Sequence, residues 1–362
     1  MNFAVFIDRG GAMPLYSQLE EAIKQEIISG RLAFGEKLPS ENEFVRELGL
    51  SRMTVRSALS DLENDGFVRK LHGKGSFVCY SAEEQIPKRV DVLLDVTYAY
   101  FSTHYIKSIS EVLSKHNYQF VIHDTRDDEG EIGVILEQIA AGGPAGVIIQ
   151  PSHRASSSDD ILRKSAVKLM QRGIPYVIFD RDLPDFPGEC ISFDDYGGGR
   201  KAAEYLVSLG HRRFAMAVCP EFSENMPRRD GFTAVLTENG LEPPIELTLD
   251  GDFTSKINDS VRKDGVTAIF AYNDEVALGV CRALTSSGLS IPRDVSVVGY
   301  DDTVFAKAAN PPLTSVIHPK ELLGRVAAEK LLSIITKNHY EIPENAFEPS
   351  ISIRESCARP RK

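Results

Sequence analysis

Residues 38–78 read LPSENEFVRELGLSRMTVRSALSDLENDGFVRKLHGKGSFV, and this stretch predicts two short helices followed by a hairpin. Ser40 and Glu43 have the spacing of a capping box, so the first helix begins there, and Gly49 is the expected end of that helix. A tight link then leads to Ser51, the expected N-cap of the second helix. Two helices joined by a short turn that contains glycine form the helix-turn-helix pattern.

The second helix of this stretch has one apolar face and one polar face. Its apolar residues recur at i, i+4 and i+7: Val55, Leu59 and Leu62. Arg52, Thr54 and Arg56 lie largely on the remaining surface, in the turns of a recognition helix that reach bases and phosphates in the major groove. The pattern therefore favours DNA binding, although exposed arginines and a helix–hairpin unit also occur in proteins that bind no DNA.

The residues after Gly66 alternate around glycines, which predicts a hairpin. Its tip is a small wing able to enter a neighbouring groove, and it carries His72, Gly73 and Lys74. An amphipathic helix marked by Leu15, Leu19, Ile23 and Ile27 precedes the stretch and is expected to pack beneath the two helices.

From Pro14 to Val78 the chain resembles the GntR family of bacterial winged-helix regulators, through the motifs PLYSQL, ISGRLAFGEKLPSENE, LSRMTVRSALSDLENDG and HGKGSFV. The resemblance implies DNA contacts on both helices and at the wing tip. The implied positions, together with the neighbouring Ser51 and Lys74, are Asn42, Arg52, Thr54, Arg56, His72 and Gly73. Many members of the family have arginine where this chain has Asn42, so one contact differs.

Length and composition bound the remaining possibilities. A chain of 362 residues with 42% apolar residues is long enough for two or three domains. Five scattered cysteines without CxxC spacing argue against a disulfide framework and a zinc cluster, and no apolar segment predicts a signal peptide or a membrane span. We therefore expect a cytoplasmic protein with no metal and no cofactor. The net charge of −11 argues against indiscriminate nucleic-acid binding, so DNA binding should be site-specific and dimeric.

After residue 89 the pattern changes to apolar runs that alternate with segments of helical period. The first runs are VDVLLDV, YQFVIHD, AGVIIQP and PYVIFDRD, and a second set from about Cys190 comprises ECISFDD, RFAMAVC, TAIFAYND and DVSVVGYDD. Continuous apolar strands alternating with helices are typical of parallel sheets buried on both faces, and two sets of similar size predict two α/β lobes. The expected organisation is a winged helix-turn-helix domain at residues 1–79, a linker at 80–89 and a two-lobed α/β domain at 90–362.

Polar residues cluster where these strands end, and ligands bind beyond the carboxyl ends of strands in open α/β sheets. Two lobes facing each other across such ends would form a cleft suited to a polyhydroxylated ligand. Aspartate and asparagine also cap helices after strands, and about half of these residues are expected to do only that.

Residues 90–357 resemble the effector domain of the LacI family, which is similar to periplasmic sugar-binding proteins. The motifs are ISFDDYGGGRKAAEYLVSLGHRRFAM, AIFAYNDEVALGVCRALTSSGLSIPRDVSVVGYDD and NPPLTSVIHPKELLGRVAAEKLL. The implied effector-binding residues are Tyr98, Phe101, Asp180, Arg181, Asp195, Arg228, Phe253, Asn273, Asp301 and His318. Because the chain has no Trp, Phe253 or Tyr98 would supply the aromatic ring for the sugar, and His318 stands where glutamine is common.

A GntR-type domain fused to a LacI-type domain is the arrangement of the AraR group of arabinose repressors. The resemblance implies a homodimeric repressor that binds operator DNA and is released by a sugar or polyol; the residues alone leave the sign of that effect open. The alternatives are a sugar-binding module without a regulatory role and a magnesium-dependent sugar-phosphate enzyme, built on FDRDLP together with Asp301 and Asp302. Because no GxxxxGK[ST], GxSxG or HExxH motif occurs, we expect no catalytic residues.

Overall fold

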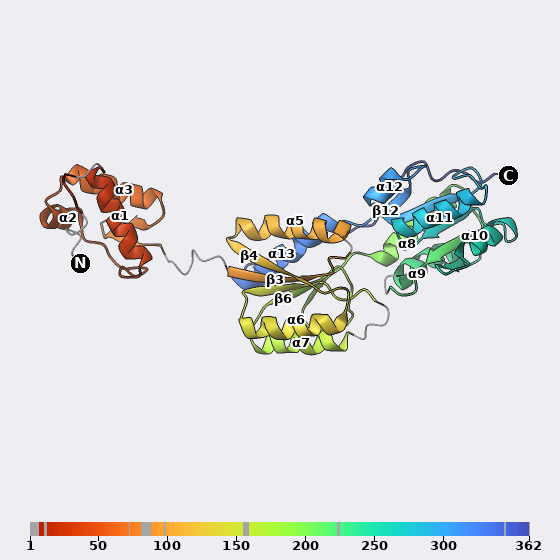
Figure 1. Ribbon diagram of the computed structural model, residues 1–362, viewed down its shortest axis with the longest axis horizontal. Coiled ribbons are helices and arrows are strands. Elements are labelled where there is room, and N and C mark those ends of the chain that lie inside the picture. Colours follow the sequence, from red (N-terminus) through yellow and green to blue (C-terminus); the bar gives the residue numbers. More distant parts are fainter. Residues whose placement is uncertain are drawn as a thin grey trace. The chain divides into compact units, whose positions relative to one another are not determined.

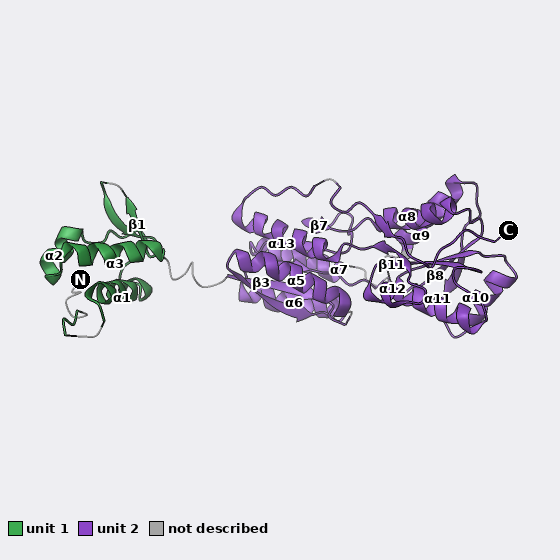
Figure 2. Cartoon of the chain, turned by 90° about the horizontal axis from the view of Figure 1, so that it is seen from above, with its two compact units in different colours: residues 1–87 green, residues 88–362 purple. Residues whose placement is uncertain are grey.

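A computed structural model describes residues 7–10, 13–71, 73–80, 88–97, 99–154, 159–222, 225–343 and 345–361. The chain divides into two compact units, Met1–Pro87 and Lys88–Lys362 (Figure 2). Residues 81–87, which make up most of the expected linker, and two predicted contact residues, His72 and Tyr98, lie outside the described residues.

The described part of the first unit contains three helices and a hairpin. Its elements are α1 (Leu15–Ile28), α2 (Glu41–Leu48), α3 (Arg52–Asn64), β1 (Val68–Leu71) and β2 (Gly75–Val78). The two strands pair antiparallel, with Val68 opposite Val78, so the predicted hairpin is confirmed. The helices and the hairpin close over one core that includes Leu19, Ile23 and Phe44.

The predicted helix ends of the first unit are also confirmed. Ser40 accepts a hydrogen bond from the backbone of Glu43 while the Glu43 side chain accepts one from the backbone of Ser40, which is a complete capping box. Gly49 ends α2 in the left-handed conformation, and Ser51 caps α3 by accepting from the backbone N–H of Thr54. These contacts fix the turn between the two helices.

The second unit has two α/β lobes, as predicted. The first lobe is a parallel sheet in the order β4-β3-β5-β6-β7. Its elements are β3 (Lys88–Leu94), α5 (Ala99–Lys115), β4 (Tyr118–Asp124), α6 (Glu129–Gly142), β5 (Gly146–Ile149), α7 (Asp160–Gln171), β6 (Tyr176–Phe179) and β7 (Glu189–Ile191). Figure 1 shows α6 and α7 on one face of this sheet and α5 with α13 (Lys320–Thr336) on the other.

The second lobe is a mixed sheet in the order β13-β12-β11-β10-β8-β9, in which only β13 runs antiparallel to its neighbour. Its strands are β8 (Phe214–Val218), β9 (Ile245–Thr248), β10 (Ala268–Ala271), β11 (Ser296–Asp301), β12 (Thr314–Ile317) and β13 (Ser350–Ser352). Its helices are α8 (Asp195–Ser208), α9 (Asn225–Glu238), α10 (Phe253–Arg262), α11 (Asp274–Ser286) and α12 (Val304–Ala308). One buried core cluster contains residues of both lobes, so the lobes share a hydrophobic core.

The boundary between the lobes differs from the sequence prediction. The segment ECISFDD was expected to open the second set of strands, but its strand, β7, pairs with β6 at the edge of the first sheet, with Phe179 opposite Ile191. The chain crosses to the second lobe only afterwards, and α13 later returns to pack on α5, β5, β6 and β7. Which strand β7 pairs with depends on contacts between neighbouring strands, and an apolar run in the sequence does not specify those contacts.

Candidate functional site

The polar face of α3 is exposed and lies beside the start of α2. Arg52 and Arg56 are both exposed, and Arg52 donates from Nη2 to Oδ1 of Asn42 over 2.7 Å. The hydroxyl of Thr54 makes a 2.8 Å hydrogen bond with the hydroxyl of Ser51, and this bond stabilises the start of the helix. The structure therefore brings five of the predicted DNA-contacting residues onto one surface: Asn42, Ser51, Arg52, Thr54 and Arg56.

Glu41, which was not among the predicted contact residues, lies beside this surface. Its carboxylate is 3.1 Å from Nη2 of Arg56 and 3.4 Å from Nζ of Lys70. The hydrogen bond from Arg56 is the largest cause that lowers the pKa of Glu41. Such exposed pairs contribute little to stability, so the arginine remains available to a phosphate at small cost.

At the wing tip, Gly73 adopts a φ of 72°, a conformation that glycine reaches without strain. Gly73 and Lys74 are exposed, and the backbone N–H of Lys74 donates to the carbonyl of Leu71 over 3.0 Å. The hairpin thus projects a small, positively charged turn.

The second unit contains a cavity of about 680 Å³, open solvent at its mouth included, at the carboxyl ends of the strands. The cavity is lined by Asp95, Phe101, Asp127, Gln150, His153, Asp180, Asp195, Phe222, Arg228, Tyr272, Asn273, Asp301 and His318. These residues come from both lobes and from the segments that cross between them.

Asp180 is buried on the first-lobe side of the cavity. One carboxylate oxygen accepts from the hydroxyl of Tyr105 over 2.6 Å, and the other accepts from Nε2 of Gln150 over 2.7 Å. His153 and His318 each approach the carboxylate to 3.4 Å. Burial alone would raise the pKa of Asp180, but hydrogen bonds and charge from the two histidines outweigh it and hold the pKa well below its usual range.

Arg228, on α9, is the central cation on the second-lobe side. Its Nε donates to Asp195 over 2.8 Å, its Nη1 donates to the carbonyl of Tyr272 over 2.8 Å, and its Nη2 lies 3.8 Å from Asp301. The guanidinium also lies 3.8 Å from the ring centroid of Tyr300. Burial opposes the charge of Arg228, but the nearby Asp195 and the other acidic groups outweigh burial and raise the pKa. A buried, fixed guanidinium of this kind presents paired hydrogen-bond donors.

Two buried polar atoms at the cavity have no hydrogen-bond partner among the residues that the structure describes: Oδ1 of Asp301 and Nδ1 of His318. Their side chains are 6% and 4% exposed. Asp301 has a φ of 95° and Asp180 a φ of 75°, conformations that are sparsely populated by residues other than glycine. Unpaired buried polar atoms and strained backbone in one cavity are typical of a ligand site.

Two of the predicted effector-binding residues, Arg181 and Phe253, are not among the residues that line the cavity. Arg181 makes a two-pronged ion pair with Asp159, at 2.8 and 2.9 Å, and Phe253 packs against the second-lobe core at the start of α10. Tyr98 lies outside the described residues. The aromatic residues that do line the cavity are Phe101, Phe222 and Tyr272, and the last two stack with ring centroids 5.8 Å apart.

Several cavity residues were missed by the sequence prediction, including Asp127, Gln150, His153 and Phe222. Gln150 follows β5 directly and His153 lies three residues further on, so the strand-exit rule could have identified them. Nothing local distinguishes Phe222, which reaches the cavity because its segment pairs by one backbone bridge with Arg154 of the other lobe.

The magnesium-site alternative finds no support in this geometry. Asp302 points to Arg354, at 2.5 Å, and not into the cavity. Within the described ranges, no group of three or more His, Cys, Asp or Glu side chains could hold a metal ion. None of the helices in the described part of the chain has the length and apolar character needed to span a bilayer.

Comparisons with known proteins agree with this two-part architecture. Residues 15–78 match the model of the bacterial regulatory proteins of the gntR family, and residues 203–357 match a periplasmic binding protein-like domain. The arabinose metabolism transcriptional repressor of Geobacillus stearothermophilus is 29% identical over 357 residues, which cover 95% of this chain and 98% of that protein. The regulator CelR of Thermobifida fusca is 33% identical over 262 residues, covering 69% of this chain and 74% of CelR.

Solved structures show the same relationship. A complex of the transcriptional regulator CelR with cellobiose matches with a TM-score of 0.61 at 25% identity and covers 88% of this chain and all of that one. A LacI-family regulator of Enterococcus faecium with bound ribose matches with a TM-score of 0.61 at 27% identity, covering 76% of this chain and 100% of that one.

Proposed function

This chain belongs to the bacterial transcriptional regulators that join a GntR-family DNA-binding domain to a periplasmic-binding-protein-like domain, and on that premise we propose that it represses carbohydrate-utilisation genes and leaves its operator when a small sugar or polyol binds in the cavity. The observation that supports effector binding is that two buried atoms, Oδ1 of Asp301 and Nδ1 of His318, accept no hydrogen bond from any described residue, although the former lies 3.8 Å from Arg228. A hydroxyl group can donate to the first atom and can pair with the second in either tautomer. A polyol therefore supplies what these groups lack.

The charges around the cavity favour an uncharged effector. Five of the lining residues are aspartates, and Arg228 is the lining residue with a permanent positive charge. Asp195 already neutralises much of that charge at 2.8 Å. A phosphate or carboxylate ligand would meet unfavourable repulsion from these aspartates in a buried site, whereas a neutral sugar would not.

The aromatic walls fit the same class of ligand. Phe101 and Phe222 line the cavity and present apolar surface, and carboxylate and guanidinium groups line the same cavity. A sugar ring has apolar C–H faces and a polar rim, so it can contact rings and hydrogen-bonding groups at the same time. Asp180, Arg228, Asn273 and Asp301 are the residues proposed to hold it.

The DNA half of the proposal rests on the exposed surface formed by Asn42, Arg52 and Arg56 with the wing at Gly73 and Lys74. One such small surface makes few contacts, and selective binding is expected from a homodimer on a palindromic or near-palindromic operator. Dimerisation through the effector lobes and action in the cytoplasm, where the DNA lies, belong to the same proposal.

The proposed effector can be tested with matched variants of adjacent residues. Asp301 lines the cavity, whereas Asp302 pairs with Arg354, and both residues have positive φ, which asparagine tolerates. A thermal-shift screen of neutral sugars and their phosphates should show stabilisation by at least one neutral sugar. Asp301→Asn should abolish that shift and leave operator binding nearly unchanged, while Asp302→Asn should keep the shift. Stabilisation by sugar phosphates alone, or equal responses of both variants, would contradict the proposal.

A further inference from the structure

Asp274 is a buried carboxylate that lies behind the cavity and does not line it. It is the first residue of α11, directly after the cavity residue Asn273, and its side chain is fully buried. Its Oδ2 accepts from the backbone N–H and the hydroxyl of Thr303, over 2.7 and 2.8 Å, and its Oδ1 accepts from the hydroxyl of Ser315 over 2.7 Å. All three bonds come from the turn after β11 and from its neighbour β12.

These bonds fix the backbone immediately after Asp301. The backbone N–H of Asp302 donates to the hydroxyl of Ser315 over 3.0 Å, so the amides of both residues after Asp301 are tied to Asp274, one directly and one through Ser315. Asp301 and Asp302 have φ values of 95° and 50°. Such conformations are unfavourable for residues other than glycine and persist only where surrounding contacts enforce them.

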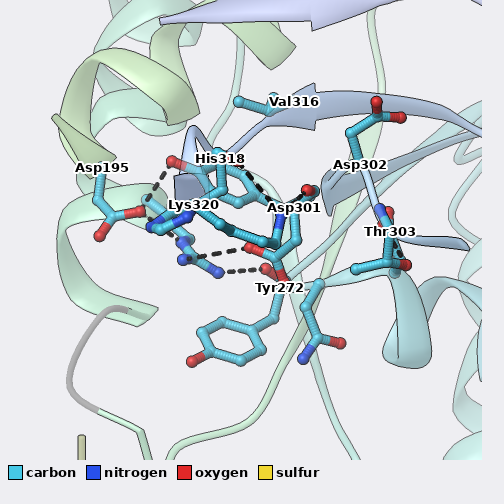
Figure 3. Close-up of polar contacts among 12 residues, drawn as sticks. Asp195, Tyr272, Asp301, Asp302, Thr303, Val316, His318 and Lys320 are labelled. Carbon is cyan, nitrogen blue, oxygen red and sulfur yellow. Dashed lines mark hydrogen bonds and ion pairs between the residues drawn. The ribbon is translucent and has the colours of Figure 1, made fainter. Parts of the chain in front are cut away.

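The preceding strand also approaches Asp274 closely. A Cβ atom added at Gly299 would lie 2.3 Å from Oδ1 of Asp274, so only glycine fits at this position of β11. On the other side of the turn, the buried ammonium of Lys320 donates to the carbonyl of Asp301. Figure 3 shows Asp301, Asp302 and Thr303 as consecutive residues of this turn, with Lys320 beside Asp301.

We infer that Asp274 is a positioning residue for the effector: by holding the amides of Asp302 and Thr303, it keeps the turn in the conformation that directs Oδ1 of Asp301 to the ligand. This inference rests on the proposed function for the role of Asp301. Asp274 itself touches no ligand. Its removal therefore affects effector binding through the turn and leaves the cavity-lining side chains chemically intact.

The test compares Asp274→Ala and Asp274→Asn with a control elsewhere in the same sheet. Ser356→Ala is the control. The buried hydroxyl of Ser356 accepts from the backbone N–H of Thr314 and donates to the carbonyl of Val297, near the ends of β12 and β11 that lie away from the turn at Asp301. Affinity for arabinose, ribose or cellobiose, whichever binds the wild-type protein, is measured by calorimetry. Hydrogen exchange at the amides of Asp302 and Thr303 is measured without sugar.

Asp274→Ala is expected to weaken sugar binding roughly tenfold or more, as the loss of buried hydrogen bonds to the turn implies, and to speed exchange at both amides. Asp274→Asn retains a carbonyl acceptor and should restore part of the affinity. Ser356→Ala should lower the melting temperature without changing the affinity. Unchanged affinity and unchanged exchange in Asp274→Ala would overturn the inference, as would an affinity loss equal to that of Ser356→Ala.

If Asp274→Ala does not fold, Ser315→Ala tests the same network, because it removes the link between Asp274 and the amide of Asp302. Faster exchange at Asp302 with weaker sugar binding would support the inference, and wild-type behaviour would overturn it. If the wild-type protein binds none of the three sugars, the proposed function fails for these sugars. Exchange at the two amides still decides whether Asp274 holds the turn.

Discussion

The Nε2 atom of His318 lies 3.4 Å from Oδ1 of Asp180, so a residue on the crossover after β12 meets the residue that follows β6. This contact links the two lobes at the cavity. The same carboxylate accepts hydrogen bonds from Tyr105 and Gln150 of the first lobe. The position of Asp180 therefore matters both for folding and for the proposed ligand.

Asp180→Asn should lower stability and weaken sugar binding. Both carboxylate oxygens accept hydrogen bonds, and in the variant an NH₂ group, which cannot accept, takes the place of one of them. The expected loss of unfolding free energy is about 1 to 3 kcal/mol at neutral pH. The folded-state pKa of Asp180 is depressed, so the wild-type advantage is present above the unfolded pKa of about 3.9 and is lost as the pH falls below it. Denaturant unfolding of both proteins between pH 3 and pH 7 measures this; a difference independent of pH would refute the assignment.

Asp274 should show the opposite pH dependence. Burial, and then the charge of Asp301, raise the pKa of Asp274 to about 7, while the neighbouring Thr303 and Ser315 oppose the shift by donating hydrogen bonds. A raised pKa makes the stabilising contribution largest below the unfolded value and removes it as the pH rises to about 7. Relative to Asp274→Asn, the wild-type protein should therefore lose stability over this range, by at most about 1.4 kcal/mol per pH unit. A wild-type protein that gains stability relative to the variant would exclude the raised pKa.

Arg52→Ala and Arg56→Ala should each cost about 1 to 3 kcal/mol of operator binding, because each removes a guanidinium from the exposed face of α3. Lys263→Ala removes the same charge from an exposed position of the effector domain and should have little effect. Fluorescence anisotropy with operator DNA at two salt concentrations provides the measurement. Normal operator binding by both arginine variants would show that α3 is not the recognition helix.

The protein should be a dimer at concentrations that saturate the operator, since a single winged helix buries too little surface for selective binding. Analytical ultracentrifugation with and without operator DNA checks this. A monomer bound to DNA under saturating conditions would require another explanation of specificity.

Sugar and operator should weaken each other's binding by the same factor, about 5- to 150-fold, because coupling between two equilibrium binding sites is reciprocal. Sugar titrations with and without operator, and operator titrations with and without sugar, measure both factors. Tighter sugar binding in the presence of operator would identify a co-repressor instead of an inducer. Equal affinities would show that the two sites are not coupled.

The sequence by itself determined the features that depend on neighbours a few residues apart. Ser40 and Glu43 cap α2, Ser51 caps α3, and Gly49 ends a helix in the left-handed conformation, because each partner lies within one helical turn. The apolar runs likewise predicted buried parallel strands, since a strand covered on both faces needs no polar alternation. The family motifs then extended these local patterns to two domains.

Only the tertiary structure decided which strand-exit residues face the cavity. Asp301 lines it while the adjacent Asp302 pairs with Arg354, and Asp180 lines it while the adjacent Arg181 pairs with Asp159. Successive side chains point in different directions, and small differences in backbone conformation decide between them. Likewise Phe222 and not Phe253 reaches the cavity, because the crossing of the chain between the lobes brings together segments far apart in the sequence. No pattern within either segment encodes that meeting, since its energy comes from contacts that exist only once both lobes have folded.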